Sequence, residues 1–524
     1  MLRRRLAEVL SLPGEAITSL KVLRRSLDAR RSRPPYFVYA LEVVLPEATP
    51  LPASAGEGIS IHLPGEGPAL VPLPPSGQGK FPARAEKKVV VVGSGPAGLF
   101  AALTLAEQGV AVLLLERGKP VPARCRDVRD FWDQGALQGE SNVLFGEGGA
   151  GTFSDGKLTS RAKDPRIRQV KETLVALGAP AEIVTEAKPH IGTDRLRALV
   201  MNFRKKLLGL GCEVRFGARV SDFLLREQCL VGIVVNGVEE VGAECLVLAM
   251  GQHADDTYGK LRERGVHLEP KAFALGLRVE HPQGLINELQ YGKWWPHPDL
   301  PPADYALTAA TGQEGRSVYT FCMCPGGRIV GCSSEPGGVV TNGMSRSRRD
   351  GPYANSAVVV NVRIADFLGT PQEPLRGLAF RRNWEEKAFS LGGGDYCAPA
   401  QRLLDFLRDK ESAQLLPTSF RPGVRSALLR EALPTFVAEA LKEGLRLFER
   451  KMPGFITEEA MLVGVETRTS APVRILRDEN GQSVSTAGLF PCGEGAGYAG
   501  GIISSALDGI RAAEKVLISL ESRQ

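Results

Sequence analysis

Two cysteines one residue apart, Cys322 and Cys324, occur in the segment FCMCPGG at residues 321–327. Thiols at this spacing suit a redox-active pair, part of a metal site, or two small side chains packed in a hairpin. The alternation in SVYTFCMC predicts a strand with both thiols on one face. Their Cα atoms would lie roughly 6–7 Å apart, so a disulfide would require a bend in the strand. We expect a type II turn at Pro325-Gly326 and a return strand over 328–334.

A second chemical signal is GSGPAG at residues 93–98, which has GxGxxG spacing. An apolar strand pattern, 89–92, precedes it, and a helical pattern and a second strand ending in Glu116 follow. In such a unit the glycines allow a tight turn, the approach of a pyrophosphate and close helix packing, while the acid can bind a ribose. The segment therefore predicts dinucleotide binding. The predicted contacts are Gly93, Ser94, Gly95, Pro96, Ala97, Gly98, Glu116 and Arg117.

Two later stretches favour a flavin over a nicotinamide dinucleotide. A strand over 245–249 runs into Met250-Gly251, and a C-terminal strand over 489–491 runs into Gly493-Glu494. A glycine-rich turn then leads to a helix beginning at Ile502. Glu494 can bind a ribityl or ribose hydroxyl, and the helix N-terminus can stabilise negative charge on a flavin. The predicted contacts are Gly251, Gly493, Glu494, Gly500, Gly501 and Ile502.

Together these segments resemble the two-dinucleotide-fold flavoproteins, in the branch shared with glutathione reductase and fumarate reductase. The resemblance implies bound FAD, although Met250 and Glu494 depart from the usual residues. A closer resemblance is to a family of uncharacterised FAD-dependent dehydrogenases of bacteria and plastids, and it implies FAD and oxidoreductase activity without naming a substrate. Four blocks in order carry it: FGEGGAGTFSDGKLTSR (145–161), FCMCPGGRIVGCSSEPGGVVTNGMS (321–345), GVETRTSAPVRI (464–475) and GEGAGYAGGIISSALDGI (493–510).

The resemblance also points to candidate catalytic residues. In related flavoproteins the loop corresponding to 145–158 runs beside the isoalloxazine ring, which implies that Gly148, Gly149 and Gly151 contact the cofactor. Asp155 and Lys157 would then lie near the reacting edge, unless they only shape a turn.

Three more polar residues are candidates on the substrate side. Glu335 lies in a polar, glycine-containing loop, and such loops commonly face a ligand. Arg468 can bind a substrate carboxylate or phosphate, or pair with a structural acid. His190 is a possible acid or base, although a lone histidine before a helix more often caps or packs.

Composition limits the kind of protein. The nine cysteines are scattered without a CxxC, and none of the six histidines has zinc-site spacing, so we expect reduced thiols and no metal site. No long apolar run indicates membrane insertion, and we expect a cytoplasmic location. The net charge of +6 arises from residues 1–35, and such a basic segment could bind nucleic acid, an anionic surface or an acidic cofactor, or could simply form a solvated helix face.

These observations predict a flavoenzyme that binds a small-molecule substrate. One GxGxxG is opened by a strand, so a separate NAD(P)H-binding domain is not expected, and the hydride would come from the substrate itself, from transiently bound NAD(P)H or from another protein. Two alternatives stay open. The basic N-terminus suits a flavin-dependent RNA-modifying enzyme, and a non-catalytic flavoprotein that senses redox state or assists assembly is the other.

The predicted fold class is α/β. We expect a discontinuous Rossmann-like FAD-binding domain, 86–265 and 456–524, with an inserted α+β substrate domain, 266–455. A small α/β domain, 1–45, and a Pro/Gly-rich linker, 46–85, precede them. Within the substrate domain, amphipathic helices are expected at 354–368 and 430–452.

Overall fold

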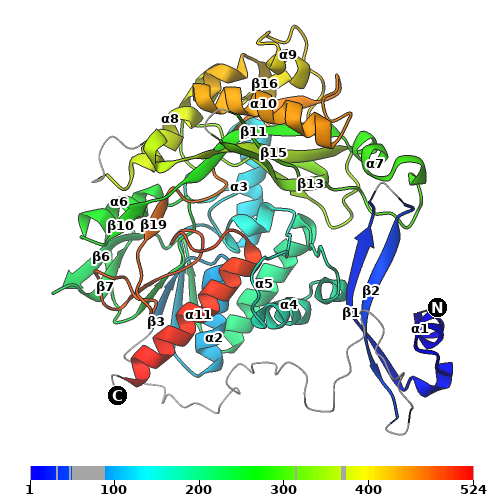
Figure 1. Ribbon diagram of the computed structural model, residues 1–524. Coiled ribbons are helices and arrows are strands. Elements are labelled where there is room, and N and C mark those ends of the chain that lie inside the picture. Colours follow the sequence, from blue (N-terminus) through cyan, green and yellow to red (C-terminus); the bar gives the residue numbers. More distant parts are fainter. Residues whose placement is uncertain are drawn as a thin grey trace.

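The computed structural model describes residues 2–30, 33–46, 49, 89–312, 315–367 and 373–522, and shows a mixed α/β fold (Figure 1). Two large sheets dominate it, one of five strands and one of eight. Nearly all of the linker predicted at 46–85 lies outside the described residues. Among the helices that are described, none combines the length and the apolar character needed to cross a bilayer.

The five-stranded sheet is parallel and has the order β20-β9-β3-β4-β5. Its β3 is a run of four buried valines, as expected of a strand covered on both faces. The C-terminal β20 joins a sheet built mainly from residues before 250, so this Rossmann-like unit is discontinuous. The strands are β3 (Val89–Val92), β4 (Val112–Glu116), β5 (Glu213–Phe216), β9 (Leu246–Leu248) and β20 (Leu489–Pro491).

Helices pack against this sheet (Figure 1). The predicted start of a helix at Ile502 is confirmed by α11. A Cβ at Gly509 of α11 would lie 2.0 Å from the Ala97 oxygen of α2, so the two backbones touch. The helices of this unit are α2 (Pro96–Glu107), α3 (Val121–Gln134), α4 (Arg166–Ala176), α5 (Thr193–Gly209), α6 (Asp255–Glu263) and α11 (Ile502–Glu521).

The eight-stranded sheet forms the second body and has the order β12-β13-β15-β11-β18-β16-β17, with β14 paired to β13. Its strands are β11 (Phe273–Pro282), β12 (Thr308–Ala310), β13 (Ser317–Gly331), β14 (Thr341–Ser345), β15 (Tyr353–Val362), β16 (Ala398–Arg402), β17 (Val424–Ser426) and β18 (Met461–Glu466). The helices are α7 (Gln283–Tyr291), α8 (Arg376–Leu391), α9 (Leu403–Leu407) and α10 (Thr435–Lys451).

Two features of this sheet differ from expectation. The helix predicted at 354–368 is wrong, because 353–362 forms β15, a central strand that pairs with β11 over its whole length. Its run of β-branched valines suits a strand buried on both faces. The second part of the FAD-binding domain was expected to begin at residue 456. β18 lies after this residue and pairs with β11, so this segment still belongs to the eight-stranded sheet.

The hairpin predicted at Pro325-Gly326 is also wrong. β13 continues through both residues, with register shifts against β15 between Phe321 and Cys324 and between Cys324 and Gly327. The bulged region tolerates the proline, which has no N–H to donate. Cys322 has φ 48°, a left-handed conformation that is uncommon for a residue with a side chain.

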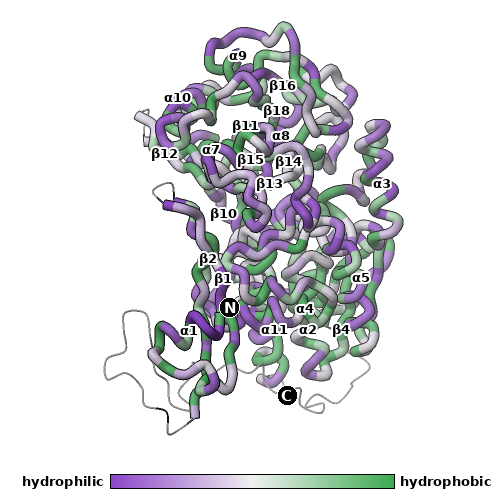
Figure 2. Tube along the Cα trace, turned by 90° about the vertical axis from the view of Figure 1, so that its right-hand side faces the viewer, coloured by the Kyte–Doolittle hydropathy of each residue, from purple (hydrophilic) through white to green (hydrophobic). Residues whose placement is uncertain are grey.

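The remaining described elements lie at the edges. An antiparallel arm extends beside the main body in both views (Figures 1 and 2), and its Arg25 forms an ion pair with Glu186 at 2.8 Å. The elements are α1 (Leu2–Leu10), β1 (Ser19–Asp28) and β2 (Tyr36–Val44) in the arm, the sheet β6 (Val220–Arg226), β7 (Cys229–Val235) and β8 (Glu239–Gly242), and the pair β10 (Leu268–Pro270) and β19 (Val473–Ile475).

Candidate functional site

A cavity of about 410 Å³ runs from the carboxyl ends of β3, β4, β9 and β20 to the bulged part of β13. Carboxyl ends of parallel strands are where α/β proteins bind ligands, and the volume is typical of a ligand pocket. Every predicted cofactor residue except Gly98 and Gly148 lines it: Gly93, Ser94, Gly95, Pro96, Ala97, Glu116, Arg117, Gly149, Gly151, Gly251, Gly493, Glu494, Gly500, Gly501 and Ile502.

The turn between β3 and α2 can hold a phosphate. A Cβ at Gly95 would meet nothing closer than the Gly149 Cα at 4.0 Å, so the backbone is open to the cavity. No side chain caps the first amides of α2. These free amides and the helix dipole favour an anion. Gly98 has the packing role expected of the third glycine, because a Cβ there would lie 1.8 Å from the Gly93 oxygen.

Gly148 serves the loop instead of the cavity wall. Its φ is 84°, and a Cβ would lie 2.2 Å from the Thr152 hydroxyl oxygen and 2.8 Å from a Val200 methyl carbon. The loop can therefore pass beneath the cavity only with glycine at this position.

The first turn of α11, which begins at Ile502, offers a second set of uncapped helix amides near the cavity, while the amides of Gly500 and Gly501 before it bind Ser504 and Glu494. A Cβ at Gly500 or Gly501 would meet no atom within 4 Å, and no side chain caps this helix. Burial raises the pKa of the nearby Glu494 to about 7, although a hydrogen bond from Gln252 opposes the shift. The Gln252 side-chain oxygen is buried without a partner. These groups fit a polar ligand that supplies hydroxyls and negative charge.

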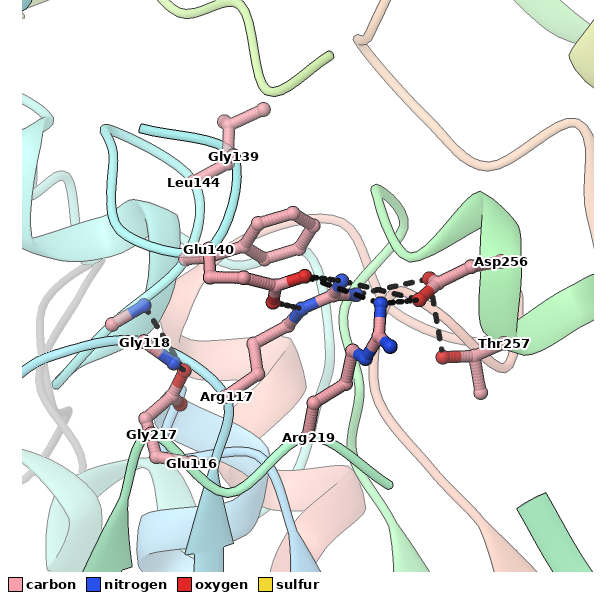
Figure 3. A network of polar contacts seen from close by, with 12 residues as sticks. Glu116, Arg117, Gly118, Gly139, Glu140, Leu144, Gly217, Arg219, Asp256 and Thr257 are labelled. Atoms are coloured by element: carbon pink, nitrogen blue, oxygen red, sulfur yellow. Dashed lines mark hydrogen bonds and ion pairs between the residues drawn. The ribbon is translucent and has the colours of Figure 1, made fainter. Parts of the chain in front are cut away.

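Where β4 ends, the cavity is lined by a network of hydrogen bonds and ion pairs around Glu116 and Arg117 (Figure 3). The Glu116 carboxylate accepts four hydrogen bonds, from the Ser94 amide and hydroxyl and from the amides of Gly118 and Gly146. Four bonds match the lone-pair sites of a carboxylate, so Glu116 joins these turns. The ribose contact predicted for it would have to share these sites.

Arg117 lies between two acids and an aromatic ring. Its guanidinium pairs with Glu140 at 2.7 Å and with Asp256 at 3.0 Å, and lies 4.1 Å from the centre of the Phe145 ring. Arg219 contacts the same two acids, at 3.4 and 3.8 Å (Figure 3). Since both arginines and Phe145 line the cavity, this end offers flat and charged surfaces to a base and its ribose.

Sequence reasoning missed Arg124, which organises the glycine-rich loop. Its fully buried guanidinium donates to the backbone oxygens of Asn142, Val143, Glu147 and Gly149 at 2.7–2.9 Å. Burial lowers the pKa of Arg124 to about 10. The signal was present in the sequence, because an arginine shares the apolar face of α3 that buries Val121, Val128 and Phe131.

The structure brings Asp155 and Lys157 together at the β13 end of the cavity. The buried Asp155 carboxylate pairs with Lys157 at 2.8 Å and with Arg349 at 2.6 Å, and accepts a hydrogen bond from the Ser345 hydroxyl. Burial by itself would raise the pKa of Asp155, but the two cations outweigh it and hold the pKa below its usual range. Asp155 is thus a fixed anion that orients Lys157.

The other two catalytic candidates have different surroundings. Arg468 lines the cavity, but Glu385 binds its guanidinium through two contacts of 2.8 Å, so the structural-acid alternative describes it. Glu335 lies outside the cavity lining and faces Arg382 at 3.6 Å, because its loop packs toward α8. This placement does not favour the predicted catalytic role of Glu335.

Two histidines differ in their position relative to the cavity. His190 lies outside the cavity lining and contacts the Ser347 oxygen at 3.0 Å, which fits a packing role. His253, which sequence reasoning missed, lines the cavity. Burial, with Arg468 and Arg381 nearby, lowers the pKa of His253 well below its usual value, so its imidazole is neutral.

Among the residues with described side chains, no group of three or more metal-ligating residues is found.

Comparison with known proteins identifies the family. A model described as FAD-dependent protein, C-terminal domain-like, matches residues 272–469, an FAD binding domain model matches 86–124, and a domain of unknown function matches 1–44. An uncharacterized protein of Clostridium beijerinckii is 45% identical over 520 residues, covering 99% of this chain and 96% of that protein. The chain belongs to this family of FAD-dependent proteins. The phosphate cradle, the second helix N-terminus and the unpartnered Gln252 oxygen fit FAD.

More distant FAD-dependent proteins match less well. The FAD-dependent monooxygenase nodY2 of Hypoxylon pulicicidum is 29% identical over 207 residues, covering 36% of this chain and 42% of that protein. A solved structure of a variant of the halogenase PltM with FAD has 11% identity and a TM-score of 0.40, and covers 84% of this chain and 71% of that one.

Proposed function

We propose that this FAD-dependent protein is an oxidoreductase that transfers two electrons between FAD and a substrate bound near Lys157. One observation carries the proposal: a single cavity joins the phosphate cradle at Gly95 to polar groups supplied by the eight-stranded sheet. A substrate at that end would lie beside the ring system of a dinucleotide whose pyrophosphate occupies the cradle. FAD, when bound, supplies two-electron chemistry at flavin N5.

In this proposal the residues of the protein bind the cofactor and orient it toward the substrate. The amides of α2 hold the pyrophosphate, and the network at Arg117 receives the adenosine. The amides at the start of α11 favour negative charge at the ring system, and Glu494 faces the hydroxyl-bearing linker. Lys157, with 29% of its side chain exposed, offers positive charge at the substrate end, where Asp155 fixes its position.

The electron donor in this proposal is NADH or NADPH, bound transiently. The GxGxxG at 93–98 already serves the proposed FAD site. A nicotinamide donor would therefore have to enter at the substrate end of the cavity. The donor and the substrate would occupy this end one after the other, and the donor would leave before the substrate binds.

The test is an anaerobic spectrum of the purified protein, recorded before and after NADH and NADPH are added separately. We expect flavin absorbance on purification and bleaching by one of the two nucleotides. A Lys157→Met variant should retain the flavin but bleach more slowly, whereas Lys260→Met, on the outer surface of α6, should behave as the wild type. Absence of flavin would refute the proposed function, and a flavin that neither nucleotide bleaches would exclude direct reduction by nicotinamide.

A further inference from the structure

We propose that Cys322 and Cys324 form a reversible dithiol–disulfide pair that passes electrons from FAD to a disulfide substrate. The proposal rests on the proposed function, because FAD is the two-electron donor, and it names the substrate class of the same site. Cys322 lines the cavity together with Lys157, while Cys324 is completely buried beside it. One thiol is therefore open to a substrate and the other is protected from it.

The backbone supplies the bend that a C-x-C disulfide requires. The first register shift of β13 against β15 falls between Phe321 and Cys324, and Cys322 between them has φ 48°. A side chain in this left-handed region is strained, and the conformation persists where the surrounding fold enforces it. In a straight strand the two thiols would be at the limit of disulfide geometry, whereas a bulge re-aims one side chain.

Hydrogen bonds and charge link the two thiols. The Cys324 thiol lies 3.2 Å from the backbone oxygen of Cys322, to which it donates. The Lys157 ammonium lies 3.6 Å from the Cys324 sulfur. The adjacent Cys324, together with Lys157 and Arg278, lowers the pKa of the Cys322 thiol, although burial opposes them. The pair thus holds one thiolate near neutral pH, on the sulfur that faces the cavity.

The surrounding acids do not cancel this effect, because cations pair with most of them. Glu466, which faces the pair from β18, forms an ion pair with Arg278 at 3.0 Å. Asp155 is shared between Lys157 and Arg349. Glu494 faces the pair from across the cavity, and burial raises its pKa to about 7, so a large part of it is neutral at neutral pH.

The reaction balances as an exchange followed by re-reduction. The Cys322 thiolate attacks one sulfur of the substrate disulfide, forming a mixed disulfide and releasing a thiolate. Cys324 gives its proton to that thiolate and attacks the Cys322 sulfur, which closes the internal disulfide and releases the second half of the substrate as a thiolate. Two electrons and one proton, drawn from reduced FAD, then restore one thiolate and one thiol.

A static packing role would not need these features. Cys332, in the same part of the eight-stranded body, is a buried thiol for comparison: its pKa is raised by burial, and its sulfur contacts the Val340 oxygen at 3.5 Å. Cys322 differs in its exposure to the cavity and its left-handed backbone, and its partner Cys324 is in contact with the Lys157 ammonium.

The first test treats the FAD-loaded protein with oxidised glutathione, blocks free thiols and maps the peptide that contains β13 by mass spectrometry. We expect the wild type to lose two hydrogens through a Cys322–Cys324 bond. Cys324→Ser should instead retain glutathione on Cys322, and Cys322→Ser should show neither product. Cys229→Ser, at an exposed site on β7, should behave as the wild type. A wild-type peptide without the internal disulfide would overturn the proposal.

The second test follows alkylation by iodoacetamide against pH, with the exposed Cys229 in the same sample as the reference thiol. At pH 6 we expect Cys322 to react at least about tenfold faster than Cys229, since it is already a thiolate. Lys157→Met should move the Cys322 profile to higher pH. Matching profiles for the two thiols would contradict the proposal. Neither thiol measurement requires flavin reduction, so failure of the proposed function would appear separately, in the spectrum with NADH and NADPH.

Discussion

Replacing Arg124 with methionine tests whether one buried guanidinium holds the glycine-rich loop in shape. Its four acceptor carbonyls, on Asn142, Val143, Glu147 and Gly149, would each lose a partner within the protein. The Glu147 oxygen would still accept a hydrogen bond from the Thr152 hydroxyl, so three carbonyls would be left unpaired. At about 2 kcal/mol for each unpaired group, the loss is about 6 kcal/mol.

A second effect opposes this loss. Burial lowers the pKa of Arg124 to about 10, well below its ordinary value, which corresponds to a cost of about 3 kcal/mol for holding the charge, and methionine removes that cost. The hydrogen bonds still dominate, so we expect Arg124→Met to lower the free energy of unfolding by about 3 kcal/mol. This is a large part of the stability of a typical domain.

The assay combines urea unfolding, followed by tryptophan fluorescence, with hydrogen exchange mapped by mass spectrometry. Arg126→Met is the matched control, because Arg126 is an exposed residue of the same helix, and we expect it to change stability by less than about 0.5 kcal/mol. Exchange should accelerate in residues 142–153 of Arg124→Met, and FAD affinity should fall, since Gly149 lines the cavity. A loss below about 1 kcal/mol, with exchange in this loop unchanged, would refute the assigned role.

Three further predictions concern packing and charge. Gly98→Ala should abolish copurification of flavin, because its Cβ would lie 1.8 Å from a backbone oxygen, whereas Gly259→Ala, with open space around it, should retain the flavin spectrum. Glu385→Gln should cost about 3–5 kcal/mol in urea unfolding by leaving Arg468 buried without its counter-charge. Burial raises the pKa of Glu280 to about 7, so its carboxyl binds its proton more tightly when folded. Wild-type stability should therefore fall by about 3 kcal/mol relative to Glu280→Gln as pH rises from 4.5 to 7, and parallel pH profiles would contradict this.

The dinucleotide unit could be predicted from the sequence because its determinants are local. The valines of β3, the glycine turn and the start of α2 occupy fewer than 20 consecutive residues, and each has one structural reason to be there. The start of α11 at Ile502 was predictable for the same reason. By contrast, 354–368 contains both helical spacing and β-branched residues, and only pairing with β11 decides in favour of a strand.

The substrate end of the site was harder to predict because distant segments form it. Arg468 was a clear candidate by residue type, but Glu385 on α8, which neutralises it, is 83 residues away in the sequence. Asp155 and Lys157 line the cavity, and the pairing of Asp155 with Arg349 across 194 residues had no local signal in the sequence.

The C-x-C segment shows how an unexpected backbone changes a chemical argument. In a regular hairpin, Cys322 and Cys324 would lie on one face at a separation that disfavours a disulfide. β13 instead pairs regularly with β15 up to Phe321 and with β14 from Gly327, which confines the irregularity to the residues between Phe321 and Gly327. The sheet on both sides can then hold Cys322 in its left-handed conformation. The same pairing places one thiol in the cavity and the other beneath it, so the bend that a disulfide requires comes from the sheet and not from a turn.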